Sequence, residues 1–202
     1  MDAGFDAGGG RRERRKRETL ERIAQRGLEL FIENGYEGTT LEAIATASGI
    51  SRRTFFYYFK SKEDVLLAHD SGRITEALSK AIRAQSTNQR PIDAARNALI
   101  FLADNFHTEN SIVVDRLLRS TEALRFRKDA SLLRLEHTLA EAFYELWPAP
   151  SLRSLLRADA MIAIGALRLA LEQWREEDGA IPLSRHLKYW FDVLSEPIRS
   201  PS

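Results

Sequence analysis

The residues best suited to recognising another molecule lie between Ser51 and Lys62, in the stretch SRRTFFYYFKSK. Two arginines precede a run of five aromatic residues, and two lysines follow it. Arginine can bond the O6 and N7 atoms of guanine, aromatic rings can pack on thymine methyl groups, and tyrosine hydroxyls can bond phosphate oxygens. The stretch can therefore bind DNA if it is a helix with one face outside. A buried strand with charged ends is the alternative, because aromatic runs also favour strands.

Capping patterns around the aromatic run favour the helix. Ser51 can cap it, with Ile50 just outside and Phe55 four positions inside, which is the spacing of a hydrophobic staple. A second pattern, from Ser61 to Asp64, predicts the start of the next helix. Both patterns place the aromatic run inside a short helix.

The helical period divides the aromatic residues between two faces. Phe55 and Phe59 are four positions apart, so they share the face that is expected to close a small core. Lys62, in the first turn of the next helix, combines its charge with a positive helix end. The outward face and its flanks are expected to form a cationic, aromatic and hydroxyl-bearing ridge of Arg52, Arg53, Thr54, Phe56, Tyr57 and Tyr58.

Two helices are predicted before this one. Apolar residues recur at three- and four-residue spacing over residues 20–32, and the turn NGYEG ends that helix. Thr39 and Glu42 match a capping box that begins the second helix, which leaves the hydroxyl of Thr40 free for a phosphate. Ala45 and Gly49 then have the spacing of a helix-turn-helix, because a small residue permits close packing and glycine permits the sharp turn.

Basic charge is concentrated in the same region. Residues 11–62 contain 12 Lys and Arg against 7 Asp and Glu, whereas residues 63–202 contain 18 against 20. The run RRERRKR, within residues 1–17, predicts a flexible basic arm that contacts phosphate or a minor groove. A solvated tail that leads into a helix is the other interpretation.

The remaining residues are expected to be helical, which makes the chain all-α. Residues 155–174 carry apolar side chains on most faces and predict a helix that is buried nearly all round. The expected helices after the aromatic run are 62–85, 92–107, 110–124, 129–147, 152–178 and 184–196.

Several classes of function lack support in the sequence. There are no cysteines, and neither a nucleophile elbow nor a phosphate or dinucleotide loop occurs, so an enzyme is not expected. No cofactor is predicted, and no metal site, because the histidines are far apart: His69, His107, His137 and His186. The most apolar stretch contains four charges, so no membrane span is expected and the chain is predicted to be cytoplasmic.

At these motifs the sequence strongly resembles the TetR family of bacterial transcriptional regulators. The resemblance covers ELFIENGYEGTT, IATASGIS and RRTFFYYFKSKEDVLL, within residues 20–67. It implies an amino-terminal three-helix DNA-binding domain at 18–62 and a helical effector-binding and dimerisation domain at 63–202. The implied function is that of a homodimeric repressor that binds a palindromic double-stranded DNA operator and is released by a small-molecule effector. A helical dimer with vestigial DNA binding, or one controlled by a protein partner, stays open, as does activation.

The resemblance also implies roles for single residues. Thr40, Tyr58 and Lys62 match positions that commonly touch phosphates. The positions that face bases or nearby backbone are matched by Arg52, Arg53, Thr54 and Tyr57. Phe56 departs from the family pattern, since a tyrosine is usual there and its hydroxyl often reaches a phosphate. Seven residues could line an apolar effector pocket, although aromatic residues at helical spacing more often belong to the core: Phe101, Phe106, His107, Leu118, Phe126, Phe143 and Trp147.

Overall fold

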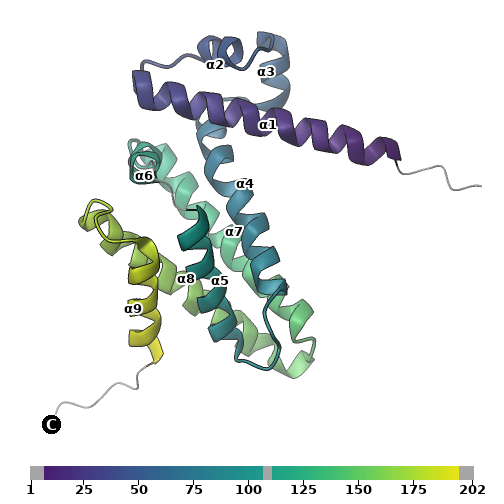
Figure 1. The fold of residues 1–202 in the computed structure, drawn as a ribbon, viewed down its shortest axis with the longest axis vertical. Helices are drawn as coiled ribbons and strands as arrows, with labels where there is room; N and C mark the ends of the chain where they lie inside the picture. The colour runs from purple at the N-terminus through teal and green to yellow at the C-terminus, as the bar shows by residue number, and fades with distance from the viewer. Residues whose placement is uncertain (1–6, 107–110, 196–202) are drawn as a thin grey trace, which may run out of the picture. The chain divides into compact units, whose positions relative to one another are not determined.

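The computed structural model describes residues 7–106 and 111–195 (Figure 1). Every regular element in these two ranges is a helix, so the predicted all-α class is confirmed for them. None of these helices combines the length and the apolar character needed to cross a bilayer. The chain divides into two compact units, residues Met1–Gly72 and Arg73–Ser202.

The first unit contains the predicted helix-turn-helix. Its elements are α1 (Ala7–Asn34), α2 (Leu41–Ala47), α3 (Arg52–Tyr58) and the first part of α4 (Lys62–Arg83). The unit ends within α4, ten residues beyond the boundary expected at 62. The physical reason is that Val65 and Leu66 are fully buried, so the first turns of α4 belong to the core of this unit.

Helix α1 packs closely on the start of α4. A Cβ atom added to Gly27 would lie 2.4 Å from Cγ1 of Val65, so only glycine fits at this contact. The small core of the unit is formed by buried side chains from α1, α2, α3 and α4: Ile23, Leu28, Phe31, Ile44, Phe55, Val65 and Leu66.

Helix α1 begins upstream of the predicted first helix. It starts at Ala7 and therefore includes the basic run of residues 11–17, which the sequence predicts to be part of a flexible arm. Arginine, lysine and glutamate are good helix formers, and Arg14 and Glu18 form an ion pair one turn apart at 3.5 Å. Residues 1–6 of the predicted arm lie outside the described residues.

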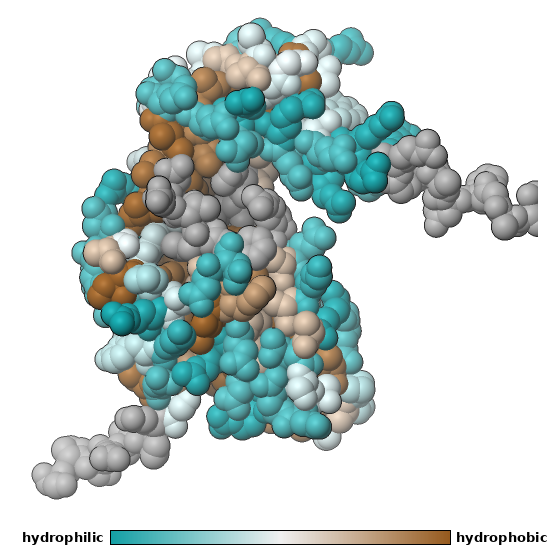
Figure 2. Space-filling view, in the orientation of Figure 1, coloured by the Kyte–Doolittle hydropathy of each residue, from teal (hydrophilic) through white to brown (hydrophobic). Residues whose placement is uncertain are grey.

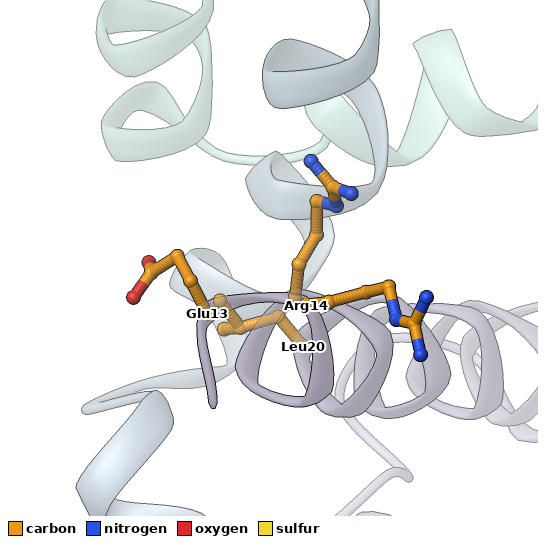
Figure 3. Close-up of a pocket in the computed structure, with 4 residues that line it drawn as sticks. Glu13, Arg14 and Leu20 are labelled. Atoms are coloured by element: carbon orange, nitrogen blue, oxygen red, sulfur yellow. The ribbon is translucent and has the colours of Figure 1, made fainter. Parts of the chain in front are cut away.

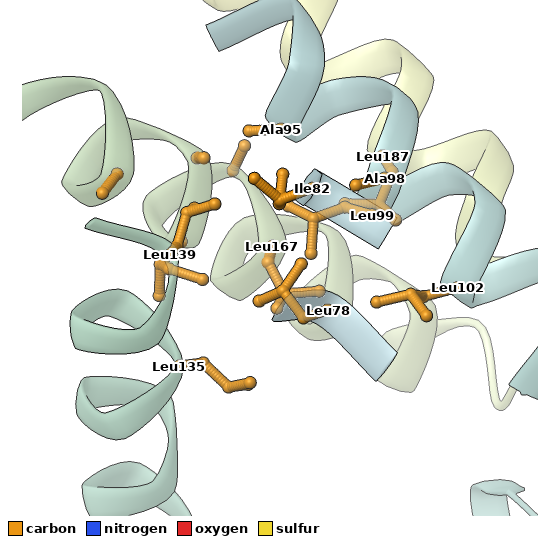
Figure 4. Packing of buried hydrophobic residues seen from close by; sticks show 14 of the residues in the cluster. Leu78, Ile82, Ala95, Ala98, Leu99, Leu102, Leu135, Leu139, Leu167 and Leu187 are labelled. Carbon is orange, nitrogen blue, oxygen red and sulfur yellow. The ribbon is translucent and has the colours of Figure 1, made fainter. Parts of the chain in front are cut away.

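The second unit is built from the rest of α4 and five further α-helices. These helices are α5 (Pro91–Phe106), α6 (Ser111–Leu118), α7 (Glu122–Leu146), α8 (Arg153–Glu176) and α9 (Leu183–Ser195), with a short 3₁₀ turn, η1 (Pro150–Leu152), before α8. Figure 4 shows leucines and alanines from α4, α5, α7, α8 and α9 meeting in one core.

Two predicted features of this unit are wrong. The helices expected at 110–124 and 129–147 have other limits. Helix α6 ends at Leu118, and α7 begins at Glu122 because the side chain of Thr121 accepts a hydrogen bond from the backbone N–H of Leu124.

Helix α8 is not buried nearly all round. It leaves an apolar face exposed that includes Met161 and Ile162.

A buried ion pair links α6 to α8. The guanidinium of Arg175 donates two hydrogen bonds to the carboxylate of Asp115, at 2.7 and 3.0 Å, and Arg119 approaches the same carboxylate at 3.6 Å. Burying a carboxylate is costly unless it is paired and hydrogen-bonded. The pair therefore holds α6 in one register against α8.

Candidate nucleic-acid interface

The turn between α2 and α3 has the geometry expected from the sequence. Gly49 has a φ of +67°, which other residues rarely adopt. The N–H groups of Gly49 and Ile50 donate to the carbonyl oxygens of Thr46 and Ala45, at 3.0 and 3.1 Å. These bonds close the end of α2 and direct the chain into α3.

Helix α3 begins where its capping signal predicts. The hydroxyl of Ser51 accepts a hydrogen bond from the N–H of Thr54 at 3.1 Å, and the two hydroxyls lie 2.8 Å apart. The helix ends at Tyr58, so Phe59 is not part of it: Phe59 has an extended backbone with φ −133°. Its N–H still donates to the carbonyl of Phe55, which completes the last turn.

The five aromatic residues divide as the helical period predicts. Phe55 and Phe59 are buried, with ring centroids 5.9 Å apart. Phe56 and Tyr57 are 42% and 68% exposed, and Tyr58 is half-buried beside Tyr57, at 5.1 Å between ring centroids. Burying two rings fixes the helix to its domain and leaves the other three for an outside partner.

Arg52 is held in place by two neighbours. Its guanidinium is 3.1 Å from the carboxylate of Glu42 on α2 and lies over the ring of Phe56, 5.6 Å from the centroid. Phe56 in turn meets the edge of Phe55, with the rings at 90°. The phenyl ring of residue 56, where the resemblance to the TetR family leads us to expect a tyrosine, thus contacts Arg52. Arg53 is exposed.

Helix α2 is capped by Thr40 and not by Thr39. The N-cap is Thr40, whose hydroxyl oxygen accepts from the N–H of Ala43 at 3.1 Å. Thr39 is buried, and its hydroxyl lies 2.8 and 3.0 Å from the carbonyl oxygens of Gly35 and Leu30. The expectation that Thr39 caps the helix is wrong, because burial favours bonds to those carbonyls. Thr40 still has its hydroxyl proton available for a phosphate.

Lys62 is not a free surface cation. Its Nζ donates a hydrogen bond to the backbone carbonyl of Tyr36 at 2.8 Å and lies 4.5 Å from the centroid of the Tyr36 ring. Its side chain is 22% exposed, and Glu37 is 3.9 Å away. Lys62 therefore joins the start of α4 to the loop after α1, and its remaining N–H groups are those that a phosphate could use.

Sequence reasoning missed the partners of these cations. Glu42 and Arg52 are ten residues apart and lie on different helices, and Tyr36 is 26 residues from Lys62. No local spacing rule connects such pairs. Glu42 is one of seven acidic residues within residues 11–62, so its charge alone did not indicate the first pair.

Two of the seven predicted effector-pocket residues are exposed at the surface of the second unit. Phe101 and Phe126 are 54% and 75% exposed. The side chain of Phe106 and all of His107 lie outside the described residues.

The other three lie within the core or at its edge. Leu118 and Phe143 are buried, and Trp147 packs against Phe143 at 5.7 Å between ring centroids. The indole N–H of Trp147 donates to the backbone carbonyl of Thr87 at 3.3 Å. Phe143 belongs to the hydrophobic core that Figure 4 draws.

A shallow hollow lies along α1 instead, lined by Glu13, Arg14, Arg17 and Leu20. Figure 3 shows that these side chains spread away from the helix rather than converge on one point. The hollow is therefore not shaped to enclose a small molecule.

A helix-turn-helix with an outward cationic and aromatic face, followed by a helical core, defines the class of one-component DNA-binding regulators. Residues 21–69 match the family model for bacterial regulatory proteins of the tetR family. Residues 21–69 thus have the amino-terminal domain of the TetR family, and the comparisons with whole proteins also find regulators of this family.

Curated relatives match less than half of the chain. The regulator TcmR of Streptomyces glaucescens is 41% identical over 91 residues, 45% of this chain and 40% of that protein. The fatty acid metabolism regulator protein of Bacillus subtilis is 30% identical over 77 residues, 37% of this chain and 40% of that protein. The matched segment spans about two fifths of the length of each of these relatives. These relatives are regulators and not enzymes.

Solved structures match over most of the chain. The TetR-family repressor FadR of Thermus thermophilus, in complex with lauroyl-CoA, is 27% identical with a TM-score of 0.62, covering 91% of this chain and 96% of that one. FadR from Bacillus subtilis in complex with stearoyl-CoA is 22% identical with a TM-score of 0.58 and covers 88% and 98%. This second likeness concerns the fold.

Proposed function

We propose that this chain is a cytoplasmic homodimeric repressor that binds a palindromic DNA operator through α3 and is released by a small-molecule effector. The observation that carries the proposal is how α3 and its C-cap residue divide their side chains: Phe55 and Phe59 are buried, while Arg53 and Tyr57 are exposed. A helix anchored in this way can enter the major groove, where one bidentate arginine–guanine contact contributes ~1–3 kcal/mol of discrimination. Thr40, Arg52, Thr54, Phe56, Tyr58 and Lys62 complete the proposed DNA-contacting set.

An exposed apolar face on α8 and α9 supports dimerisation. Helices α8 and α9 pack against one another, and their outer surfaces carry Leu155, Met161, Ile162, Tyr189, Val193 and Leu194. Apolar patches of this kind mark interaction sites. Gly165 lies one turn after Met161 and Ile162 on α8, with open space where a Cβ would stand, so a partner helix can approach closely. Two recognition helices ~34–36 Å apart would then read two half-sites.

Acyl-CoA thioesters are the first effector class to test. The relative with 27% identity over most of the chain is a repressor bound to lauroyl-CoA. An effector that binds the second unit would act by favouring a spacing of the two recognition helices that no longer fits the operator. Helix α4 begins in the first unit and ends in the second, so it is the segment through which this change would pass.

Selection from a random duplex library tests the proposal. The purified protein should enrich a two-fold symmetric sequence, and its affinity for that duplex should fall steeply with salt. Added lauroyl-CoA should weaken the binding, whereas free CoA serves as the control. Failure to enrich any sequence would favour a helical dimer with vestigial DNA binding and would overturn the proposal. If binding is specific but insensitive to acyl-CoA, only the effector class is wrong.

A further inference from the structure

The first part of α1 extends beyond the core of its unit. Downstream, Ile23, Ala24, Leu28 and Phe31 form a buried stripe along the helix. The stripe ends upstream at Leu20, which is only partly buried. All side chains of residues 12–18 are exposed, and residues 12–19 include no apolar residue. This part of α1 is therefore not held by packing against the domain.

The exposed segment carries a dense positive charge. Arg12, Arg14, Arg15, Lys16 and Arg17 are accompanied in residues 12–17 only by Glu13. Figure 2 shows hydrophilic residues covering α1 next to the grey amino-terminal residues.

Several of these cations lie one turn apart. Arg12 is three residues from Arg15 and four from Lys16, and like charges at these spacings destabilise a helix. Within this segment, Arg14 has a compensating partner in Glu18. A polyanion would remove the repulsion and stabilise the helix.

We propose that residues 12–17 of α1 bind DNA phosphates outside the base pairs read by α3, and that this contact fixes the segment as helix. The inference rests on the proposed function. Helices α1 and α3 belong to one compact unit, and Figure 1 shows α1 running past α3 toward the amino terminus. From Leu20 back to Arg12 the helix spans about 12 Å, the length of three to four phosphates along one strand at ~3.4 Å each.

The lack of apolar residues favours DNA over a membrane surface as the partner of this segment. A helix that lies on a membrane needs an apolar face beside its basic one. Residues 12–19 provide none. Phosphate binding needs only cations along a helix, and the duplex bound by α3 supplies the phosphates.

The test compares two variants with equal loss of charge. Arg12, Arg15 and Lys16 are replaced by glutamine in the first, which preserves helix propensity. The control replaces Lys80, Arg127 and Arg134, exposed cations of the second unit, by glutamine. Affinity is measured across a salt series on the selected operator, once trimmed to its symmetric core and once with about ten flanking base pairs on each side.

The wild type and the control should bind the flanked duplex more tightly than the trimmed one. The α1 variant should lose this preference, bind the flanked duplex about 10- to 100-fold more weakly at ~0.1 M salt, and show a salt slope lower by up to about 5, since six cations per dimer are lost at ~0.9 each. Amide hydrogen exchange in residues 7–19 of the wild type should slow on operator binding.

Each other outcome is decisive. If the α1 variant keeps the wild-type slope and flank preference, the inference is overturned while the proposed function stands. Equal losses in both variants would indicate general electrostatics and would also overturn it. If the wild type selects no sequence, the proposed function itself fails.

Discussion

Lys62 at the start of α4 donates a hydrogen bond to the backbone carbonyl of Tyr36, 2.8 Å away, and its ammonium group lies over the ring of the same residue. The contact joins two segments 26 residues apart and fixes the beginning of α4 to the loop that precedes α2. A side chain expected to serve only as a phosphate contact thus also stabilises the domain. Its effect on DNA binding has to be separated from its effect on folding.

Replacing Lys62 by methionine should lower the free energy of unfolding of the first unit by about 1.5–3 kcal/mol, the usual contribution of a hydrogen bond from a charged group. Thermal unfolding followed by circular dichroism measures the change. Lys60→Met is the matched control, because Lys60 is exposed, and it should shift stability by less than about 0.5 kcal/mol. Equal effects of the two substitutions would contradict the structural role of Lys62.

Gly27→Ala should destabilise the same unit although alanine is the better helix former. The new Cβ would lie 2.4 Å from Cγ1 of Val65, a stiff and fully buried side chain. Overpacking of this kind costs about 1–3 kcal/mol. In the double variant Gly27→Ala/Val65→Ala the clash is gone, so its loss in urea unfolding should be smaller than the sum of the single losses. Strict additivity would show that the two residues do not touch.

Two substitutions on α3 test which phenol hydroxyl contacts the DNA. Tyr58→Phe should weaken operator binding by about 0.5–1.5 kcal/mol, the contribution of one hydrogen bond to a phosphate. Phe56→Tyr should restore part of the loss when combined with Tyr58→Phe, because the resemblance to the TetR family implies that a phenol at residue 56 reaches a phosphate. Fluorescence anisotropy with a labelled operator gives both values. If neither single substitution changes the affinity, the assignment of hydroxyl contacts is wrong.

Ile162→Arg should convert the dimer to a monomer and abolish high-affinity operator binding, because a charge at an apolar interface loses its water without gaining a partner. Sedimentation velocity measures the oligomeric state. Phe126→Arg provides the control: Phe126 is also an exposed apolar residue, but it lies on α7. A variant Ile162→Arg that remains dimeric would place the interface elsewhere.

Arg175→Met should lower the stability of the second unit by about 3 kcal/mol, because it leaves the buried carboxylate of Asp115 without its two-bond partner. Arg116→Met tests a pair of the same chemistry at the surface, since Arg116 binds Asp178 with both side chains exposed. Exposed pairs contribute only about 0–1 kcal/mol. Chemical denaturation of the two variants should therefore differ clearly, and similar losses would argue against burial as the cause.

Local patterns in the sequence were sufficient for much of the proposed interface. The capping role of Ser51 and the positions of Phe55, Phe56 and Tyr57 follow from hydrogen bonds and side-chain spacing within two turns of one helix, so they are visible in a short stretch of sequence. The limits of α6 and α7 were misplaced for the converse reason. The cap at Thr121 lacks the acidic residue three positions later that follows the cap at Ser61.

The sequence by itself determined the helical class, the helix-turn-helix and the division of α3 into a buried and an exposed face, because each depends on interactions between near neighbours along the chain. Only the tertiary structure decided which threonine caps α2, that Glu42 contacts Arg52, that Lys62 binds Tyr36, and that α8 keeps an apolar face uncovered. These features depend on which helices and loops pack together. Packing brings together residues as far apart along the chain as Tyr36 and Lys62, or Asp115 and Arg175, and no spacing rule predicts such pairs.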